Sequence, residues 1–357
     1  MGLLWELQLL TLRKSPSVNK EFLKFSQNIG NNLDLVQGAG GNTSFKYGEI
    51  LWVKASGCWL RDALRKEIFI PVIQKHDKDG LLNTADFIVD QNFQLDKAVE
   101  SLRPSIETFL HLLMPHKYVV HLHSVNIISN SILVDGEQRL FNLLDGINWR
   151  WVNYVRPGAP LAFSAQQVID SDPDVLVLAN HGVIFGAESV EEASQLLDEI
   201  ENRVKRETRS YEFDVNLNNV ESLICNSDYC LSTNQTIHSL AFDETACSIA
   251  STGTLYPDHV VFLGAGPMTV LNIKEFTEYL KGDYVGTNDD KKNIIIVRNL
   301  GVFMLNNLGE IEESMLHCLS NVLLRTQPGD ELRYLSVKEE TELISWDAEK
   351  YRKSIQR

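Results

Sequence analysis

Short apolar runs flanked by helical segments constrain the fold of this chain more than any other feature of its sequence. The runs Lys117–His123 (KYVVHLH) and Asp174–Ala179 (DVLVLA) are rich in β-branched and apolar residues. Such runs are typical of buried strands. We expect helices over Ser105–Leu113, with Ser105 as N-cap, and over Glu188–Glu207, where charges gather on one face. Strands alternating with helices predict a layered α/β fold.

Further elements fit this pattern. Residues 1–30 predict two helices with a break near Ser15-Pro16, and Ile50–Ala55 predicts another strand. A glycine-rich turn is expected at 38–44 (GAGGNTS), and the segment VIFG at 183–186 predicts a third strand after the Asn-His-Gly turn.

A length of 357 residues predicts two domains, since a domain usually has about 100–200 residues. We expect an α/β domain over 1–212 and a linker over the Asn- and Ser-rich stretch 213–235. A smaller α/β lobe is then expected over 236–357.

The last part of the chain contains segments similar in sequence to segments of the first part. Residues 293–319 match 174–197 in having a strand, an Asn-X-Gly turn, a second strand and an acidic helix start. Residues 257–264 (PDHVVFLG) resemble 115–123 (PHKYVVHLH). Because these blocks recur in the same order, we expect the second lobe to be a degenerate internal duplication.

Charge and cysteine content exclude several classes of protein. Lys and Arg total 33 and Asp and Glu total 48, a net charge of −15, so nucleic acid and anionic membrane surfaces are not expected partners. Five cysteines without a CxxC pair argue against a disulfide framework. The chain has no apolar stretch long enough to span a membrane and no recognisable signal peptide, so we expect a cytoplasmic protein.

Three histidines are candidate metal ligands. His121 and His123 are two residues apart on a predicted strand, so their side chains share one face. His181 follows another predicted strand and precedes Gly182, which lets the backbone approach closely. Three imidazoles with an open fourth position are typical of a catalytic zinc site. The alternative is a pair of structural core histidines.

Glu107 is the candidate acid/base group. It lies near the start of the helix that precedes the His121 strand. A carboxylate there can simply stabilise the helix N-terminus. Beside a metal pocket it can instead transfer protons, because burial raises a carboxyl pKa. His111, one helical turn further on, is given no role.

The two glycine-rich turns are candidate anion sites. The turn at 38–44 and the Ser56-Gly57 turn present backbone N–H groups and hydroxyls that can bind phosphate or carboxylate oxygens. A dinucleotide fingerprint is excluded, because Thr43 occupies the place of its third glycine. Each turn by itself also fits a purely structural role.

Taken in order, these segments resemble the class II aldolase/adducin family over about residues 20–210. The resemblance implies a three-layer α/β fold for the first domain. The similarity is carried by short blocks: Gly40-Gly41-Asn42-Thr43-Ser44, Ser56-Gly57, Arg103-Pro104-Ser105-Ile106-Glu107-Thr108, His121-Leu122-His123 and Asn180-His181-Gly182. The segment 257–264 is similar to one in longer, rhamnulose-phosphate-aldolase-like members.

This resemblance implies a zinc-dependent aldolase, a lyase in carbohydrate metabolism. It implies one Zn²⁺ held by His121, His123 and His181, with Glu107 as the catalytic residue, and a ketose phosphate or related hydroxy-carbonyl sugar cleaved or formed through a metal-stabilised enediolate. It also implies a homo-oligomer, with a tetramer as the assembly that the family favours. The residues that it implies for substrate phosphate are Gly41, Asn42, Ser56, Gly57 and Ser105.

Two departures and two alternatives accompany the resemblance. Ile106 replaces a family serine, which removes one hydroxyl from the phosphate site. Glu107, where the family epimerases carry Asp, favours aldol chemistry. A sugar-phosphate epimerase, dehydratase or decarboxylase on the same scaffold is the first alternative, and a non-catalytic adducin-like interaction module is the second. In the expected duplication within 236–357, the positions of the three histidines are filled by Phe262, Gly264 and Leu300.

Overall fold

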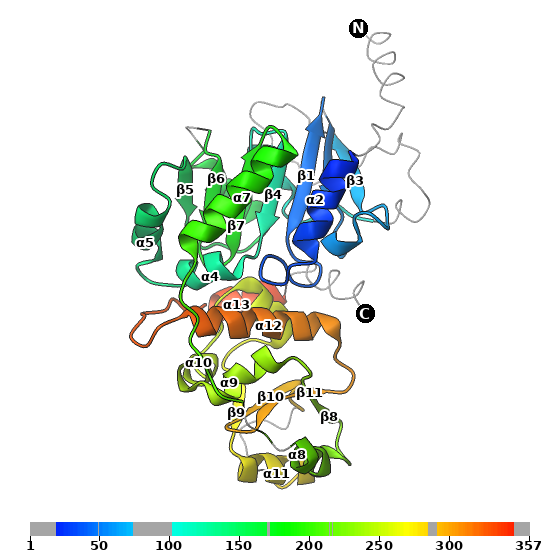
Figure 1. The fold of residues 1–357 in the computed structure, drawn as a ribbon, viewed down its shortest axis with the longest axis vertical. Coiled ribbons are helices and arrows are strands. Elements are labelled where there is room, and N and C mark those ends of the chain that lie inside the picture. The colour runs from blue at the N-terminus through cyan, green and yellow to red at the C-terminus, as the bar shows by residue number, and fades with distance from the viewer. Residues whose placement is uncertain are drawn as a thin grey trace. The chain divides into compact units, whose positions relative to one another are not determined.

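A computed structural model shows an α/β protein (Figure 1). It describes residues 19–48, 50–73, 102–169, 172–213, 215, 217–284 and 291–345. The first of the two helices expected within 1–30 falls outside the described residues. The chain divides into two compact units: the first has residues up to His123 with 146–178 and 183–202, and the second has 124–145, 179–182 and the residues from Arg203 on.

The first unit is built on a seven-stranded sheet with the order β3-β2-β1-β4-β7-β6-β5. Its strands are β1 (Asn42–Tyr47), β2 (Ile50–Lys54), β3 (Phe69–Ile73), β4 (Tyr118–Leu122), β5 (Trp149–Val152), β6 (Val175–Leu178) and β7 (Gly182–Ala187). Its helices are α2 (Lys20–Gly30), the 3-10 turn η1 (Leu60–Asp62), α3 (Thr108–Leu113), α6 (Ala159–Gln166) and α7 (Val190–Val204).

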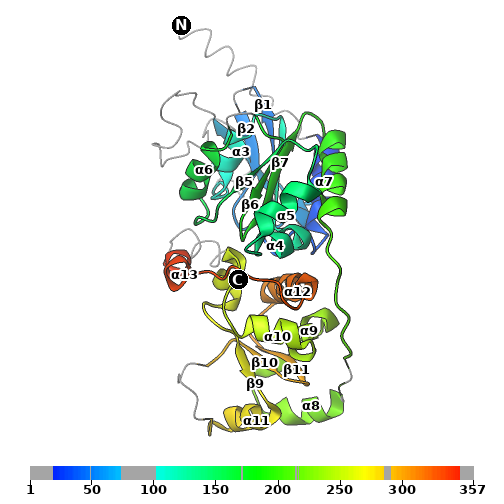
Figure 2. The same cartoon turned by 90° about the vertical axis from the view of Figure 1, so that its left-hand side faces the viewer.

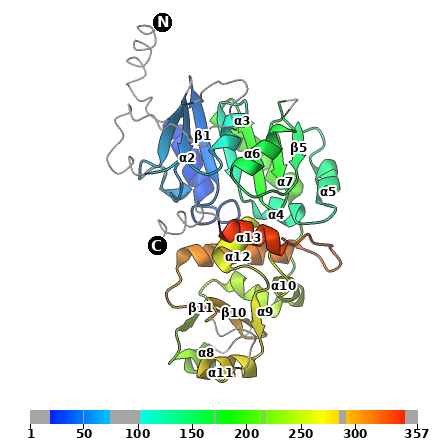
Figure 3. The ribbon, with the colours of Figure 1, turned by 180° about the vertical axis from the view of Figure 1, so that it is seen from behind.

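Helices cover both faces of this sheet. Figures 2 and 3 show α3 and α6 on one side of the strands, and Figure 2 shows α7 on the other. Phe109 of α3 and Leu161 of α6 pack with Val119 of β4 and Ile184 of β7 in one buried cluster. Such burial of apolar side chains holds the layers together. The expected three-layer α/β domain is therefore confirmed.

Two local expectations need correction. The helix expected from Ser105 begins at Thr108, and Glu107 occupies its N-cap position. The turn expected over 38–44 ends earlier, because Asn42 is already the first residue of β1. Gly38 and Gly41 have positive φ angles and make the turn itself, a conformation that favours glycine.

The second unit contains a four-stranded sheet with the order β8-β11-β10-β9. Its strands are β8 (Tyr229–Leu231), β9 (Thr269–Leu271), β10 (Ile294–Val297) and β11 (Gly301–Leu305). Its helical segments are α4 (Val125–Ser131), α5 (Gly136–Leu143), α8 (Leu217–Ile224), η2 (Gln235–His238), α9 (Ser239–Phe242), α10 (Glu244–Ala250), η3 (His259–Leu263), α11 (Ile273–Lys281), α12 (Glu310–Arg325) and α13 (Val337–Ile344).

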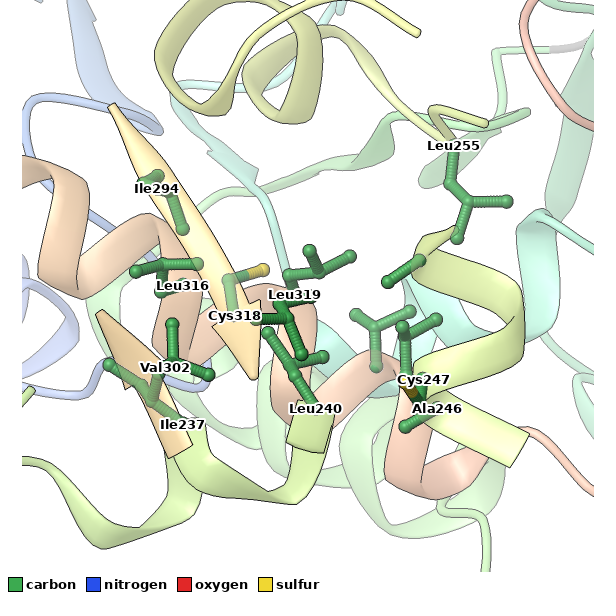
Figure 4. Packing of buried hydrophobic residues seen from close by; sticks show 14 of the residues in the cluster. Ile237, Leu240, Ala246, Cys247, Leu255, Ile294, Val302, Leu316, Cys318 and Leu319 are labelled. Carbon is green, nitrogen blue, oxygen red and sulfur yellow. The ribbon is translucent and has the colours of Figure 1, made fainter. Parts of the chain in front are cut away.

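Alternate residues of β10 face two apolar layers, as the two-residue period of a strand requires. Ile294 and Ile296 join a cluster with Leu240 of α9 and Leu316 of α12, which Figure 4 shows from close by. Ile295 joins the opposite cluster, with residues of α8 and α11. Figure 2 shows these two helix layers on the two sides of the sheet. The smaller α/β lobe is therefore present.

The stretch 213–235, expected to be a linker, contains α8 and β8. Strand β8 pairs antiparallel with β11, with Phe303 opposite Leu231. This stretch therefore contributes an edge strand to the second sheet. None of the helices in the described part of the chain is long and apolar enough to cross a membrane.

The strand order of the second sheet matches that of part of the first. The order β8-β11-β10-β9 corresponds to β4-β7-β6-β5, and in each sheet the last two strands of that order are parallel. Asn180 and Asn299 occupy the same place in the two corresponding turns, with φ angles of 51° and 56°. Their backbone N–H groups donate to equivalent helices, Asn180 to Ser131 and Asn299 to Ala241.

The segment 257–264 has no counterpart in the matching strands of the first sheet. It was matched to the His121 strand, but residues 259–263 form the π-helical turn η3, and β8 holds the place of β4. Phe262 and Gly264 are therefore not at the positions of His121 and His123, whereas Leu300 does follow Asn299 as His181 follows Asn180. Pro257 explains the helical start, because proline is favoured in the first turn of a helix.

Candidate metal centre

The first two histidines lie at one end of β4. In the sheet register, His121 pairs with Asn42 of β1 on one side and Ile184 of β7 on the other. His121 and His123 are buried. Two residues apart on an extended backbone, both imidazoles point the same way, and their Nε2 atoms lie 3.2 Å apart. The two side chains therefore share one face of the strand, as their spacing in the sequence predicts.

A hydrogen bond to a backbone carbonyl fixes the orientation of the His121 ring. Its Nδ1 lies 3.0 Å from the carbonyl oxygen of Val183. Because a carbonyl only accepts, Nδ1 is the donor of this bond, and Nε2 is the ring nitrogen that faces the other side chains of the site. Metal-binding histidines are commonly fixed in this way by a backbone carbonyl.

His181 lies in the short turn that joins β6 to β7. The preceding Asn180 has a left-handed backbone, which asparagine tolerates better than most residues. Gly182 follows at the first position of β7. This turn brings the buried His181 side chain to the end of the sheet where His121 and His123 lie.

Glu107 completes the group from the loop before α3. Its backbone N–H donates to Ser105 Oγ at 3.3 Å, and its carboxylate Oε2 accepts from Asn42 Nδ2 at 3.1 Å. The same Oε2 lies 3.1 Å from His121 Nε2. Asn42, expected to contact substrate phosphate, therefore holds the candidate acid/base group.

These four side chains form a compact donor set. One ligand atom from each of Glu107, His121, His123 and His181 lies within 4.8 Å of the others, and all four residues are buried. Ligand atoms about 2.0–2.1 Å from a tetrahedral zinc ion lie roughly 3.3 Å from one another. The measured separations of 3.1 and 3.2 Å match that spacing. Three imidazole nitrogens and one carboxylate therefore fit a divalent metal ion such as Zn²⁺.

His111, which had no role assigned from the sequence, is close enough to His121 and Glu107 to interact with them electrostatically. It is fully buried, and its Nδ1 lies 2.7 Å from Ser44 Oγ. Burial, together with the neighbouring His121, lowers the pKa of His111 to about 3. The ring is therefore neutral at physiological pH and adds no positive charge beside the donor set.

A buried lysine links the two glycine-rich turns. Lys54, the last residue of β2, donates from Nζ to the Ala39 carbonyl at 2.8 Å and to the Cys58 carbonyl at 2.7 Å. Its side chain is 1% exposed. A buried ammonium must be satisfied by hydrogen bonds, and these two tie the turns together.

The other expected anion-binding residues lie on the same loops. Ser56 donates its backbone N–H to the Arg103 carbonyl at 2.9 Å, which joins the Ser56-Gly57 turn to the loop that carries Ser105 and Glu107. A Cβ on Gly41 would come within 2.4 Å of Val36 Cγ1 and 3.0 Å of the His121 carbonyl. Glycine at this position therefore allows the turn to pack closely against β4.

Sequence reasoning missed Lys54 and the contacts of Ser44 and Asn42. Lys54 had a signal: it is a charged residue at the end of an otherwise apolar strand, directly before a Ser-Gly turn. The partners of Ser44 and Asn42 lie 67 and 65 residues away along the chain, so no local pattern could identify them.

Comparison with known proteins identifies a family over this region. The family model described as Class II Aldolase and Adducin N-terminal domain matches residues 20–207. The chain is 29% identical over 198 residues to the "Uncharacterized oxidoreductase YuxG" of Bacillus subtilis (strain 168). That match covers 50% of this chain but only 28% of the length of YuxG.

Two solved structures show similarity over about the same part of the chain. The N-terminal class II aldolase domain of a conserved protein from Thermoplasma acidophilum is 28% identical, with a TM-score of 0.41, over 54% of this chain and 93% of that one. YgbL from Klebsiella pneumoniae, named as a candidate aldolase/epimerase/decarboxylase, is 21% identical, with a TM-score of 0.37, over 55% of this chain and 87% of that one.

Proposed function

Because the chain belongs to the class II aldolase and adducin N-terminal domain family over residues 20–207, we propose that it is a zinc-dependent aldolase. The observation that carries this proposal is the buried donor set of three histidines and Glu107. We propose His121, His123 and His181 as the metal ligands. A bound divalent ion would supply Lewis-acid stabilisation of the negative charge that develops on the substrate oxygen during C–C bond cleavage.

Glu107 is proposed as the group that moves protons in this reaction. When an aldol C–C bond breaks, its electron pair remains on the carbon next to the carbonyl, and that carbon must gain a proton. A carboxyl group is suited to this step when it is buried and held in one orientation. Its contact with Asn42 Nδ2 supports that role.

The substrate is proposed to be a ketose phosphate or a related hydroxy-carbonyl sugar. The residues assigned to its anionic group are Gly41, Asn42, Ser56, Gly57 and Ser105. Four of them lie on loops tied together by Lys54 and by the Ser56–Arg103 backbone bond, and Asn42 directly follows the first of these loops, which supports this assignment. A protonated Lys54 would add local positive potential to a chain whose net charge is −15.

The test starts with metal content. Purified wild-type protein and His123→Ala are compared by elemental mass spectrometry, with His116→Ala as the matched control. His116 is a histidine of the same unit that contacts Asp174 instead of the donor set. We expect about one zinc ion per wild-type and control chain, and a loss in His123→Ala. Absence of metal from the wild type after reconstitution would refute the proposal.

An assay of the reconstituted enzyme then separates the reactions open to this scaffold. Dihydroxyacetone phosphate is incubated with small aldehydes, and aldol products are measured. The same samples are tested for epimerisation, dehydration and decarboxylation of sugar phosphates and sugar acids, because these reactions also develop charge next to a carbonyl. Metal without turnover of any of these compounds would leave the non-catalytic module as the better description.

We further propose that the chain acts as a cytoplasmic homo-oligomer whose second lobe is a metal-less copy of the first. The five free cysteines fit a reducing compartment. Val134 and Phe141, at 60% and 65% exposed, are apolar residues available to a second copy. The equivalence of the Asn180 and Asn299 turns supports the copy, and light scattering measures the oligomer.

A further inference from the structure

The turn that carries His181 is held by hydrogen bonds from residues far along the chain. Asn180 Nδ2 donates to the carbonyl oxygens of Leu255 and Arg333, both at 2.8 Å. Asn180 Oδ1 accepts from Arg333 Nη1 at 3.3 Å. Asn180 is fully buried, so every polar atom of its amide is used inside the protein. All three residues belong to the second unit.

Arg333 is itself fixed by its surroundings. Its backbone N–H donates to the Ile132 carbonyl at 2.8 Å, and its Nη2 lies 2.6 Å from Glu339 Oε1. Glu339 is anchored in turn by Ser336 at the start of α13, where the two residues form a capping box. The carbonyl and guanidinium that meet Asn180 therefore have little freedom to move.

Leu255 is held from the same segment. The backbone N–H of Leu335 donates to the Thr254 carbonyl at 2.9 Å. Glu340 Oε1 accepts from the backbone N–H of Gly266 at 2.9 Å and from Thr254 Oγ1 at 2.5 Å. Residues 254–266 and 333–340 thus form one connected network around Asn180.

We propose that Asn180 and Arg333 are positioning residues for the candidate metal centre, through which the C-terminal part of the chain sets metal affinity. This inference depends on the metal site proposed above. Asn180 directly precedes His181, so the side-chain bonds of Asn180 restrict the backbone that aims the third imidazole. Loss of partners that orient metal ligands typically weakens metal binding by about 10–100-fold.

The chain contains a matched control for this proposal. Asn299 has nearly the same φ angle as Asn180 and the same kind of backbone bond to the preceding helix. Its side chain, however, is exposed, and the residue after it is Leu300. Replacing each asparagine by glycine accommodates the left-handed backbone in both turns. Only the change at position 180 removes the side-chain bonds to Leu255 and Arg333.

The experiment measures zinc affinity by competition with a chromogenic chelator in wild type, Asn180→Gly, Asn299→Gly and Arg333→Gln. The visible spectrum of each Co²⁺-loaded protein reports ligand geometry independently of activity. We expect Asn180→Gly to bind zinc about 10–100-fold more weakly, with an altered Co²⁺ spectrum. Arg333→Gln should shift affinity in the same direction, and Asn299→Gly should match wild type.

Other results overturn the inference. Equal zinc affinity in Asn180→Gly and wild type would show that the amide does not position His181. An equal loss of zinc affinity in Asn180→Gly and Asn299→Gly would show that the effect does not come from the side-chain bonds of Asn180. If Asn180→Gly does not fold, wild-type affinity in a folded Arg333→Gln refutes the role of Arg333. A wild type that binds no metal would instead refute the proposed function, on which this inference depends.

Discussion

Nε2 of His121 lies 3.1 Å from Oε2 of Glu107, and both residues are buried. This spacing allows two roles for the carboxylate, as a fourth metal ligand or as a proton carrier beside the metal. The two roles predict different metal binding when the charge of Glu107 is removed. If Glu107 is only a proton carrier, the three imidazoles still bind the metal ion.

Glu107→Gln should therefore lower turnover by about 10²–10⁴-fold while metal stays bound. The amide keeps the shape of the side chain but cannot transfer the proton. Steady-state kinetics and elemental analysis of the same sample measure both effects. Glu244→Gln, an exposed glutamate in the first turn of α10, is the control and should keep full activity. If the variant lost its metal together with its activity, Glu107 would be a metal ligand and not only a proton carrier.

Ser44→Ala should destabilise the first unit. His111 is fully buried, and the serine hydroxyl is the group that pairs with its Nδ1. Leaving a buried polar atom unsatisfied costs about 1–3 kcal/mol. Urea unfolding measures the change. Ser129→Ala is the control, because the buried Ser129 hydroxyl donates only to a helix carbonyl, and its loss should cost less. An equal loss in the two variants would contradict the role assigned to Ser44.

Much of the fold around the site follows from local sequence. The runs that end in His121 and at Ala179 predicted β4 and β6, because β-branched residues over that length favour strands. The three histidines and Glu107 were candidates because they stand at strand and helix ends. Strand ends bring short segments together at one edge of a sheet.

The features that the sequence did not predict depend on long-range contacts, or on short apolar runs that fit a strand and a helix equally well. The run His259–Leu263 has the composition of a strand yet forms the η3 turn, since a short apolar run fits a buried helix equally well. The pairing of Asn180 with Arg333 spans 153 residues, so nothing near either residue indicates it. The sequence also led us to expect a linker where β8 completes the second sheet.

Gly30→Ala should lower the thermal stability of the first unit, although it adds only one methyl group. An added Cβ would lie 2.1 Å from the Arg61 backbone nitrogen and 2.4 Å from the Leu60 carbonyl carbon. Backbone atoms cannot rotate away, so α2 must shift from η1, and overpacking of this kind costs roughly 1–3 kcal/mol. Gly309→Ala is the control, with no atom within 4 Å of the new methyl group. Thermal unfolding should separate the two variants, and equal midpoints would contradict the close packing.

His259 should make the stability of the protein depend on pH. Complete burial lowers the pKa of His259 from its ordinary value of 6.5 to about 3. Between these values the unfolded chain binds a proton that the folded protein does not, so stability must fall as pH falls. The contribution of His259 is fully present above about pH 6.5, and its loss has a limiting slope of about 1.4 kcal/mol per pH unit.

Urea unfolding of metal-free wild type and His259→Gln, from about pH 7 to pH 5, measures this slope, because the difference between the two proteins isolates one titrating group. Glutamine keeps an acceptor for the Leu255 N–H, which lies 3.4 Å from His259 Nδ1. His111, whose pKa is also lowered, is present in both proteins and cancels. We expect the wild type to lose stability more steeply below about pH 6.5 than the variant. Parallel curves would mean that His259 is protonated in the folded protein, and hence that water reaches η3.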